Sequence, residues 1–574
     1  MSHNLDPSRL LFSRAIKRIG SFFAPGSTRN DGRVNRIIPA LTGLFSTAFI
    51  LFRLFYPTTV GMGDQGDGRR LVCPLGLSNV RPWDYGDFTS HIFPSWVEHQ
   101  WYGEACGADG SGEPYYSSQT LILWPAKYLT RLLGWGNGLD TRAVAIICAM
   151  LFGILTAAFI NLLPGRASFR VIIALLITLV TADGIFSGFF VSAYSEPAAF
   201  LGVYAIMVSL LFWWRRPRLK YLSLFMVIIF SAFTIAAKTQ TASFIPVIVL
   251  ALCWQPFKDA AAKTNSKKSK KTVSEWGAVR RFAPAFIALV LLGSFTLTFS
   301  KAQPERFTEL NLYNAVFTEM LPHSPTPEED LEWFGLDPSF IESKGTTVAS
   351  TNAAVYNSLY EQFFKKVSLS KIGVFYVTHP DRLPSMATRG LQAMTQPELQ
   401  YLGSFEAGTG HEAHEKERRV PVVLNIFESF QDSAGTLFLI QILTWLMGFG
   451  VAIAPKLGAG GQAVGRLAIV FIPAIWLQFW AVMMTEGQSE IYKHLIIAGY
   501  MTALCMPLLV ALILIRFRRS KPESKFVRRD AANLQSGQAI VESYIVDPDS
   551  EAMPTRPANE LLEPTRTHEQ PPHS

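Results

Sequence analysis

The chain has 574 residues, of which 49% are apolar, and it carries a formal net charge of +8. Its mean hydropathy is +0.22, and long apolar blocks such as 171–180 and 286–299 argue against a soluble multidomain enzyme. Five cysteines without a CxxC pattern exclude a disulfide-dense secreted scaffold. On a membrane protein the positive charge reports on topology, so we expect no nucleic-acid partner.

The apolar segments predict an all-α polytopic membrane protein with about ten transmembrane helices and two large external loops. The predicted spans are 37–57, 142–163, 170–187, 197–214, 219–237, 241–255, 282–300, 434–454, 467–484 and 495–515. The sixth segment is short, and a partly re-entrant segment is the alternative there. The polar, basic N-terminal region has no short apolar core, so we expect the first span to remain as an anchor.

Basic residues orient these spans. They cluster near the N-terminus, in every second connection and after the last span, as in the segment 215–220. The positive-inside rule then predicts cytoplasmic N- and C-termini in a multi-pass protein of the cell (plasma) membrane. The loops 58–141 and 301–433 are net acidic and fall outside. An odd number of spans would place the basic tail outside, so ten fits best.

This topology divides the chain into seven regions. They are a cytoplasmic basic N-terminus (1–36), the first transmembrane helix (37–57), an external loop with candidate catalytic carboxylates (58–141), transmembrane helices two to seven (142–300), a large external loop or subdomain (301–433), transmembrane helices eight to ten (434–515) and a disordered cytoplasmic tail (516–574). Cys73 and Cys106 share the first external loop, where an oxidising compartment permits a disulfide; two free thiols are the alternative.

The first candidate site follows span one. Asp64 and Asp67 lie three residues apart among four glycines, and Arg69 follows. Glycine allows a close approach of the backbone to a ligand. A carboxylate here can accept a proton from an attacking hydroxyl, or the pair can hold a cation such as Mg or Mn. A turn with solvated aspartates is the alternative reading, and the sequence leaves metal dependence open.

Two more candidates lie at the outer ends of middle spans. Ser195 and Glu196 precede Pro197 where the chain re-enters the membrane, and Asp183 ends the preceding span. They either cap helices or place polar groups in one cavity, as polar residues at membrane depth often do. Lys238, isolated between apolar segments, either attracts an anion or extends to the interface.

The last candidates carry the remaining basic groups. Glu486 and Glu490 precede span ten, and Glu490 shares a helix face with His494 beside Lys493. This cluster suits an anionic donor and a hydroxyl acceptor, although an ion pair at a helix start is the plain alternative. In the second loop, His379 and Arg382 suit a lipid-linked phosphate, against a purely structural role.

Three short motifs carry a family resemblance. They are Gly63-Asp64-Gln65-Gly66-Asp67, Tyr194-Ser195-Glu196-Pro197 and Glu486-Gly487-Gln488-Ser489-Glu490 with Lys493-His494-Leu495. With them the chain resembles the multi-pass, lipid-phosphosugar-dependent glycosyltransferases of the GT-C type, and among these the bacterial hexose transferases of the WsfD kind. The resemblance implies a polyprenyl-phosphate-linked sugar as donor, a glycan acceptor, and a carboxylate in the first external loop as base or metal ligand. The chain departs from the family pattern at Gln65, where Asn is frequent, and at Gly68, where an aromatic residue is frequent.

The predicted function is therefore an inverting sugar transfer at the external face. The donor phosphate would bind Lys238, His379, Arg382, Lys493 or His494, while the sugar reaches toward Asp64 and Asp67. The alternatives are a transporter or flippase of lipid-linked glycans, which would show broken helices at the midplane, and an assembly protein without catalysis.

Overall fold

The computed structural model describes residues 31–63, 67–77, 94–102, 115–257 and 276–517. Within these ranges the chain is almost entirely helical, and the only sheet is a two-residue antiparallel ladder that pairs β1 (Gln100–Trp101) with β2 (Leu139–Asp140). The all-α fold class is therefore confirmed. The predicted tail beyond residue 517 lies outside the described residues.

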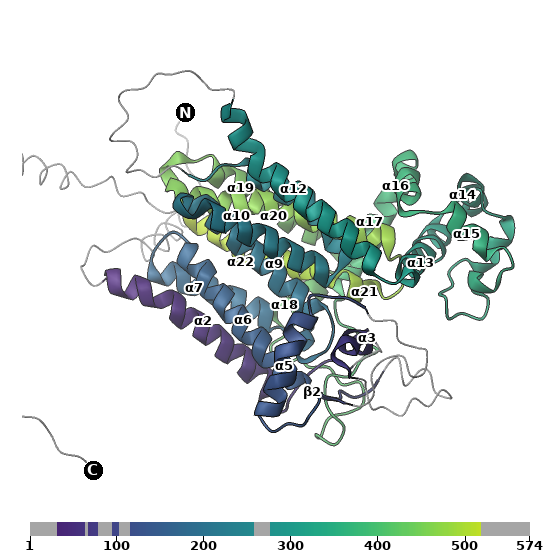
Figure 1. Ribbon diagram of the computed structural model, residues 1–574, viewed down its shortest axis with the longest axis horizontal. Coiled ribbons are helices and arrows are strands. Elements are labelled where there is room, and N and C mark those ends of the chain that lie inside the picture. Colours follow the sequence, from purple (N-terminus) through teal and green to yellow (C-terminus); the bar gives the residue numbers. More distant parts are fainter. Residues whose placement is uncertain (1–30, 64–66, 78–93, 103–114, 258–275, 518–574) are drawn as a thin grey trace, which may run out of the picture. The chain divides into compact units, whose positions relative to one another are not determined.

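Long apolar helices form the body of the protein and run side by side (Figure 1). The helices with enough length and apolarity to cross a membrane are α2 (Asp31–Phe55), α6 (Thr141–Leu162), α9 (Glu196–Arg215), α10 (Lys220–Ala237), α12 (Trp276–Ala302), α19 (Gly435–Ala452), α20 (Gly458–Thr485) and α22 (Ile496–Arg516). The described residues thus hold eight such helices. The sequence predicted about ten spans, and the difference falls on two segments.

The third predicted span is broken. Helix α7 (Ala167–Ala182) is followed by α8 (Gly184–Ser187) and η2 (Gly188–Val191), and the two parts are bent by 63° at Asp183. The sixth predicted span is η4 (Thr239–Phe244) continued by α11 (Ile245–Cys253), which is a shorter apolar helix. Counting the bent pair as one span gives nine, and the short sixth segment keeps its re-entrant alternative.

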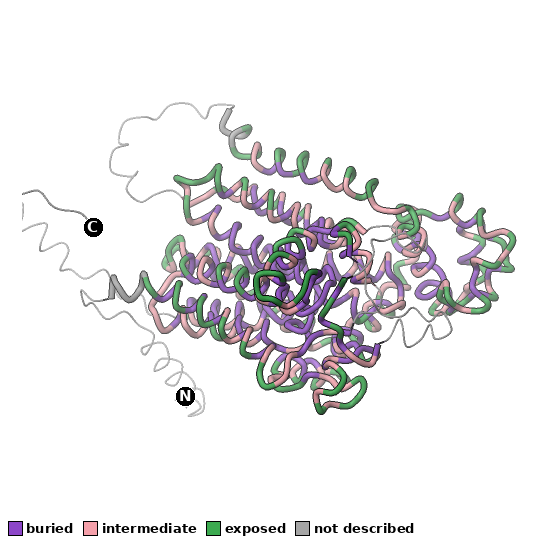
Figure 2. The backbone as a smooth tube through the Cα atoms, turned by 60° about the horizontal axis from the view of Figure 1, so that its bottom comes forward, coloured by how far each residue is buried: buried purple, intermediate pink, exposed green. Residues whose placement is uncertain are grey.

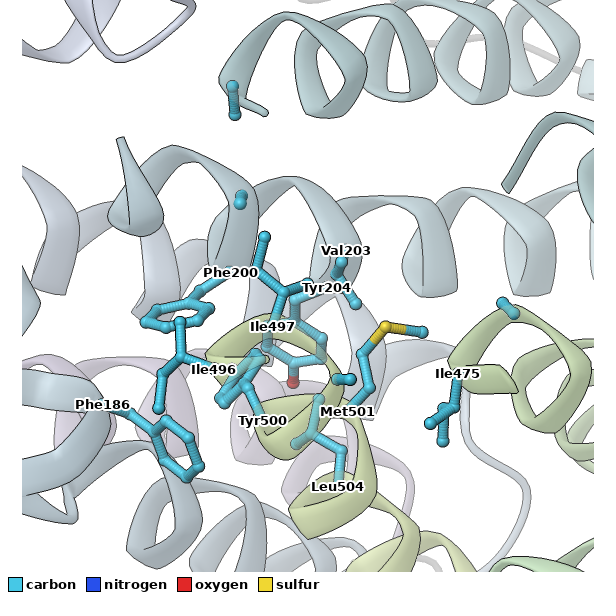
Figure 3. Close-up of a cluster of buried hydrophobic side chains, with 14 of the residues drawn as sticks. Phe186, Phe200, Val203, Tyr204, Ile475, Ile496, Ile497, Tyr500, Met501 and Leu504 are labelled. Carbon is cyan, nitrogen blue, oxygen red and sulfur yellow. The ribbon is translucent and has the colours of Figure 1, made fainter. Parts of the chain in front are cut away.

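Helix α9 lies at the centre of the bundle and is buried along nearly its whole length. Its Phe200 ring packs against α8 and α22, with the rings of Phe200 and Tyr500 4.7 Å apart and tilted. Its Tyr204 ring packs against Phe152 and Phe159 of α6. Figure 3 shows this cluster, in which Phe186 and Tyr500 meet edge to face. By contrast, α12 is mostly exposed at the edge of the bundle (Figure 2), as expected for a helix that faces lipid.

Shorter helices gather at one end of the bundle. In the first loop, α3 (Asp67–Val72), η1 (Cys73–Leu75) and α5 (Thr120–Leu132) lie there, and α5 runs at an angle to the spans (Figure 1). The second loop, which the sequence predicts to be external, forms a helical unit that we call the external subdomain after that prediction. It comprises α13 (Glu305–Tyr313), the π-helical segment η6 (Asn314–Met320), η7 (Leu321–His323), α14 (Pro327–Phe334), η8 (Pro338–Ser343), η9 (Ala354–Tyr356), α15 (Tyr360–Lys366), α16 (Leu369–Thr378), η10 (Pro380–Arg382) and α17 (Leu383–Thr395). Helices α18 (Val422–Glu428) and α21 (Ile491–His494), with η3 (Pro217–Leu219), η11 (Gln431–Ser433) and η12 (Pro455–Leu457), complete the chain.

The two long loops contact each other through backbone groups just before α3. The N–H groups of Gly61 and Gly63 donate to the carbonyls of Ser404 (3.0 Å) and Gly403 (2.9 Å). The glycines therefore serve a close approach between two protein backbones, whereas the sequence suggested an approach to a ligand. This pairing fixes the start of the segment that leads to Asp67.

Candidate functional site

Residues from distant parts of the sequence meet at the end of the bundle that carries α3 and α21. The Lys493 ammonium forms an ion pair with Asp67 Oδ2 and lies 3.5 Å from Glu490 Oε2. Only 2% of the Lys493 side chain is exposed, whereas Asp67 keeps 37% accessible. The structure thus joins the Asp67 candidate to the Glu490 and Lys493 candidate through a direct contact, with the carboxylate partly accessible and the cation buried behind it.

A second ion pair joins two of the middle spans near the same end of the bundle. Lys238, between α10 and η4, lies 2.8 Å from Glu196 Oε1 at the start of α9. Glu196 is fully buried, so the pair compensates a carboxylate that burial would otherwise disfavour. Ser195 Oγ donates weakly to Glu196 Oε2 at 3.5 Å and makes no capping bond to the helix.

A chain of amides connects these groups to the interior of the bundle. Gln240 Nε2 donates to Glu486 Oε1 at 3.0 Å and lies 3.4 Å from His494 Nδ1. Gln478 Nε2, within α20, donates to Gln240 Oε1 at 3.1 Å, and Ser243 Oγ donates to Gln478 Oε1 at 3.3 Å. Polar groups therefore continue from the site into the span, where each needs a partner.

Tyrosines surround the charged groups. Tyr194 lies under Lys493, whose Nζ is 5.3 Å from the ring centre, and its hydroxyl donates to Gly63 O at 3.3 Å. The Tyr401 hydroxyl donates to Glu490 Oε1 at 3.2 Å. Burial, together with Glu196, Glu486 and Asp67 nearby, raises the pKa of Tyr115, which places this phenol among the same carboxylates.

The local charges set the protonation states. Burial raises the pKa of Asp67, but Lys493 and then Arg70 outweigh burial and hold that pKa well below its usual value. Burial lowers the pKa of Lys493, yet Asp67 and Glu490 raise it well above the ordinary value. Burial, reinforced by Lys238 and Lys493, lowers the pKa of His494 against the opposing effect of Glu486. At neutral pH the Asp67 carboxylate is ionised and His494 is mostly neutral.

The site combines acidic and basic groups in near balance. The carboxylates of Asp67, Glu196, Glu486 and Glu490 accompany the cations of Arg70, Lys238 and Lys493. Among the described residues, no group of three or more His, Cys, Asp or Glu side chains is arranged to hold a metal ion. Asp64 lies outside the described residues, so the Mg or Mn site at Asp64 and Asp67 stays a prediction.

Asp183 is not part of this cluster. Its carboxylate accepts backbone N–H groups of Val423 (2.7 Å), Leu424 (3.1 Å) and Ile185 (3.2 Å). It therefore caps α8 and the first turn of α18, where otherwise unpaired N–H groups need an acceptor. Of the two readings given by the sequence, the structure supports the capping role.

His379 and Arg382 are held within the external subdomain. The His379 ring stacks on Phe375 with centres 4.4 Å apart, and Arg382 lies 3.3 Å from the buried carboxylate of Asp330. Throughout the described ranges, no contact joins either residue to Lys493 or Lys238. They stabilise the packing of α14, α16 and α17, and we do not assign them to the donor phosphate.

The remaining predicted residues are only partly visible. Arg69 is half-buried on α3 beside Asp67. Cys73 is disulfide-bonded, whereas Cys106 lies outside the described residues, so the pairing of these two cysteines stays a prediction.

An apolar groove opens next to the amide chain. It lies between α9, α11, α20 and α22, and it is narrow. Val203 and Met501, visible in Figure 3, are two of its lining residues, and Phe244 and Ala474 are others. Phe244 follows Ser243 in the chain, and Ala474 lies one helical turn before Gln478. The amide chain therefore comes close to the apolar groove at Phe244 and Ala474.

Sequence reasoning missed several contributors to this site. Tyr115, Gln240, Tyr401 and Gln478 were not among the predicted residues. Gln478 carries a readable signal, because a polar residue inside an apolar span usually faces a partner or a cavity. Tyr115 and Tyr401 lie in the two long loops, where one sequence does not show which aromatic residues turn inward.

Comparisons with known proteins give one family. Residues 28–536 match the family described as the YfdI N-terminal transmembrane domain. A search of curated proteins and a search of solved structures find no match. The matched range covers all of the long apolar helices, and the chain therefore belongs to the YfdI N-terminal transmembrane domain family and is a multi-pass membrane protein.

Proposed function

We propose that the protein is a membrane glycosyltransferase of the GT-C type, similar to the hexose transferases of the WsfD kind. It would move a hexose from a polyprenyl-phosphate donor to a cell-envelope glycan or lipid-linked acceptor at the external face. The observation that carries this proposal is the meeting of Asp67 with Lys493, beside the Lys238–Glu196 pair, at one end of a membrane bundle. Membership of a GT-C-like family supports it.

The chemistry divides between the two aspartates. A carboxylate that is ion-paired as firmly as Asp67 is a weak base, so we assign Asp67 to hold and orient Lys493. Asp64, three residues earlier, would take the proton of the acceptor hydroxyl as its oxygen attacks the anomeric carbon. The bond between the anomeric carbon and the phosphate oxygen breaks, and its electron pair leaves with the lipid phosphate.

Positive charge is needed where the phosphate departs. Lys493 and Lys238 are the cations of the cluster that we assign to this role, and both already hold carboxylates. Those carboxylates keep the cations in place before the donor arrives, as preorganised electrostatic stabilisation requires. His494, mostly neutral at pH 7, would donate or accept a hydrogen bond at the sugar or the phosphate.

The groove between α9, α11, α20 and α22 suits the lipid part of the donor. Its lining is apolar, and the hydrogen-bonded pair Ser243 and Gln478 lies close to its lining residues Phe244 and Ala474 in the chain. A prenyl chain in this channel would bring its phosphate toward Gln240 and His494 without exposing hydrocarbon to water. The assignment of the donor class therefore rests on an apolar groove that lies close to hydrogen-bonding and charged groups.

A flippase reading finds less support. The bend at Asp183 is a broken helix of the kind that transporters use at their binding sites. However, the Asp183 carboxylate is occupied by three backbone N–H groups, and the ion pairs described above lie at helix ends. Glycosyl transfer accounts for the paired carboxylates better than translocation does.

The test is transfer by the purified protein in proteoliposomes. The donor is a polyprenyl-phosphate hexose labelled in the sugar, offered with lipid-linked glycan acceptors. Wild-type protein should move the label to the acceptor, and Asp64→Asn should lower kcat by about 10²–10⁴-fold. Asp432→Asn, which removes an exposed carboxylate before α19, is the matched control and should keep full activity.

Two results would overturn the proposal. One is transfer at the wild-type rate by both Asp64→Asn and Asp67→Asn. The other is translocation of a labelled lipid-linked sugar across the bilayer with no glycosidic bond formed, which is the outcome expected of a flippase. An assembly protein without catalysis would transfer no sugar, and simultaneous replacement of Asp64, Glu196 and Glu490 would carry no penalty for its role.

A further inference from the structure

A buried acidic side chain outside the cluster holds the loop that presents the site residues. Glu319 lies in the π-helical segment η6 and has only 1% of its side chain exposed. One of its carboxylate oxygens accepts from Arg389 on α17, and the other accepts from Gln488 Nε2. Gln488 belongs to the turn between α20 and α21, so an external-subdomain residue reaches directly into the loop that carries Lys493.

The backbone of the same loop is also fastened to η6. The N–H of Gln488 donates to Thr318 Oγ1 at 2.9 Å. Gly487 has φ +59°, and a Cβ there would overlap the carbonyl of Asn314 and the hydroxyl of Thr318. Glu490, which is not a glycine, has φ +49°, a conformation that surrounding contacts must impose.

Glu490, whose backbone is in the strained conformation, also positions Lys493. The Glu490 carbonyl accepts the N–H groups of Lys493 (2.9 Å) and His494 (3.2 Å), and so starts α21. Contacts therefore run from Glu319 to Gln488, the chain leads from Gln488 to Glu490, and further contacts join Glu490 to Lys493 and Lys493 to Asp67. Departures from the α-helix such as η6 are frequent at functional sites.

We propose that Glu319 and Gln488 are positioning residues, which set the loop 486–490 so that Lys493 reaches Asp67. This inference rests on the proposed transferase, because it assigns a role in presenting its site. The external subdomain thereby does more than cover the membrane face: it fixes the geometry of the charged cluster from outside. Neither residue touches Asp67 or Lys238 in the described structure.

The competing explanation is a purely structural one, in which Glu319 only stabilises the subdomain. A second buried pair provides the comparison. Arg382 and Asp330 lie 3.3 Å apart in the same subdomain, and Asp330 is 2% exposed. Breaking this pair with Asp330→Asn weakens the subdomain without touching the loop 486–490. It is therefore the matched control for Glu319 and Gln488.

The variants are chosen to separate position from stability. Gln488→Glu places a second carboxylate against Glu319 and should push the loop away. The exchange variant Glu319→Gln with Gln488→Glu restores one amide facing one carboxylate. If the contact positions the loop, the exchange should recover most of what Gln488→Glu loses.

The first readout does not need transferase activity. Full-length purified protein in detergent micelles is treated with an amine-reactive reagent, and labelling of Lys493 is measured by mass spectrometry. In Gln488→Glu the labelling should rise about tenfold, which corresponds to a local opening that is ~1.4 kcal/mol easier. Asp330→Asn and the exchange variant should label Lys493 at a rate close to that of the wild type.

The second readout uses the transfer assay. In Gln488→Glu, kcat should fall about 10- to 100-fold, because a displaced charge is no longer aligned with the reacting bond. KM for the acceptor should change little. Equal labelling of Lys493 in Gln488→Glu and wild type would overturn the positioning role, as would equal labelling increases in Gln488→Glu and Asp330→Asn. A wild-type protein that transfers no sugar would refute the proposed function and leave the labelling result to decide this inference separately.

Discussion

The Asp67–Lys493 pair gives the sharpest test of the site, because its two partners differ in exposure. Removing one partner of a fully buried pair costs about 3–5 kcal/mol. In Asp67→Asn the buried ammonium keeps Glu490 at 3.5 Å, so we expect a smaller loss of about 2–3 kcal/mol. In Lys493→Met the remaining carboxylates of Asp67 and Glu490 are 37% and 31% accessible. Water can solvate them, so the loss should be about 1 kcal/mol.

The double variant completes the cycle. Asp67→Asn with Lys493→Met buries no unpaired charge and should be more stable than Asp67→Asn alone, which gives a coupling energy of about 2 kcal/mol. The assay is reversible unfolding of the four proteins in detergent micelles. Additive losses in the double variant would refute the reasoning, as would a larger loss for Lys493→Met than for Asp67→Asn.

The stability that the Asp67–Lys493 pair contributes should change with pH in a definite direction. The pKa of Asp67 is lowered in the folded protein. Burial alone would raise it, but Lys493 outweighs burial. The pair therefore contributes its full stability above the ordinary carboxyl pKa and loses it as pH falls through the lowered value. The difference between wild type and Lys493→Met should shrink in strong acid. An unchanged difference there would contradict the ion pair as its cause.

Three further predictions concern other parts of the site. Gly487→Ala should reduce transfer more than tenfold and destabilise the loop, because its Cβ would overlap η6. Gly458 has a similar positive φ with open space around it, so the control variant Gly458→Ala should keep activity. Lys238→Met leaves the buried Glu196 carboxylate without its cation, so it should lower both thermal stability and donor binding. Unchanged stability and unchanged donor binding in this variant would contradict the pair. Ala474→Trp should fill the apolar groove and raise KM for a long-chain donor more than for a short-chain analogue. Equal effects on both donors would argue against lipid in that channel.

The membrane architecture was readable from the sequence because apolar length is a direct physical requirement for crossing a bilayer. The break at Asp183 was not, because the neighbouring stretch is uniformly apolar and its hydropathy does not register a bend. The topology placed Asp67 and Lys493 on the same face of the membrane, but their direct ion pair comes only from the structure. The orientation of those ends with respect to the cell stays a prediction.

Side-chain partners were the less predictable part of the site. His379 and Arg382 have the chemistry of a phosphate site, but aromatic packing and Asp330 satisfy them within the subdomain. Glu319 was not singled out, since an acidic residue in an acidic loop shows no pattern of its own. Only the fold reveals that this side chain is buried and faces Gln488.

The capping of α18 by Asp183 has a consequence for substrate entry. The same stretch of chain is held a second time, because Glu417 forms a buried ion pair with Arg53 of the first span. Residues 417–428 are thus anchored to two membrane helices and are expected to move only with them. We therefore expect the second loop to open for a bulky glycan by displacement of α13 to α17 and not of residues 417–428. Because η6 holds the loop before α21, such a displacement would couple acceptor loading to alignment of the charged groups.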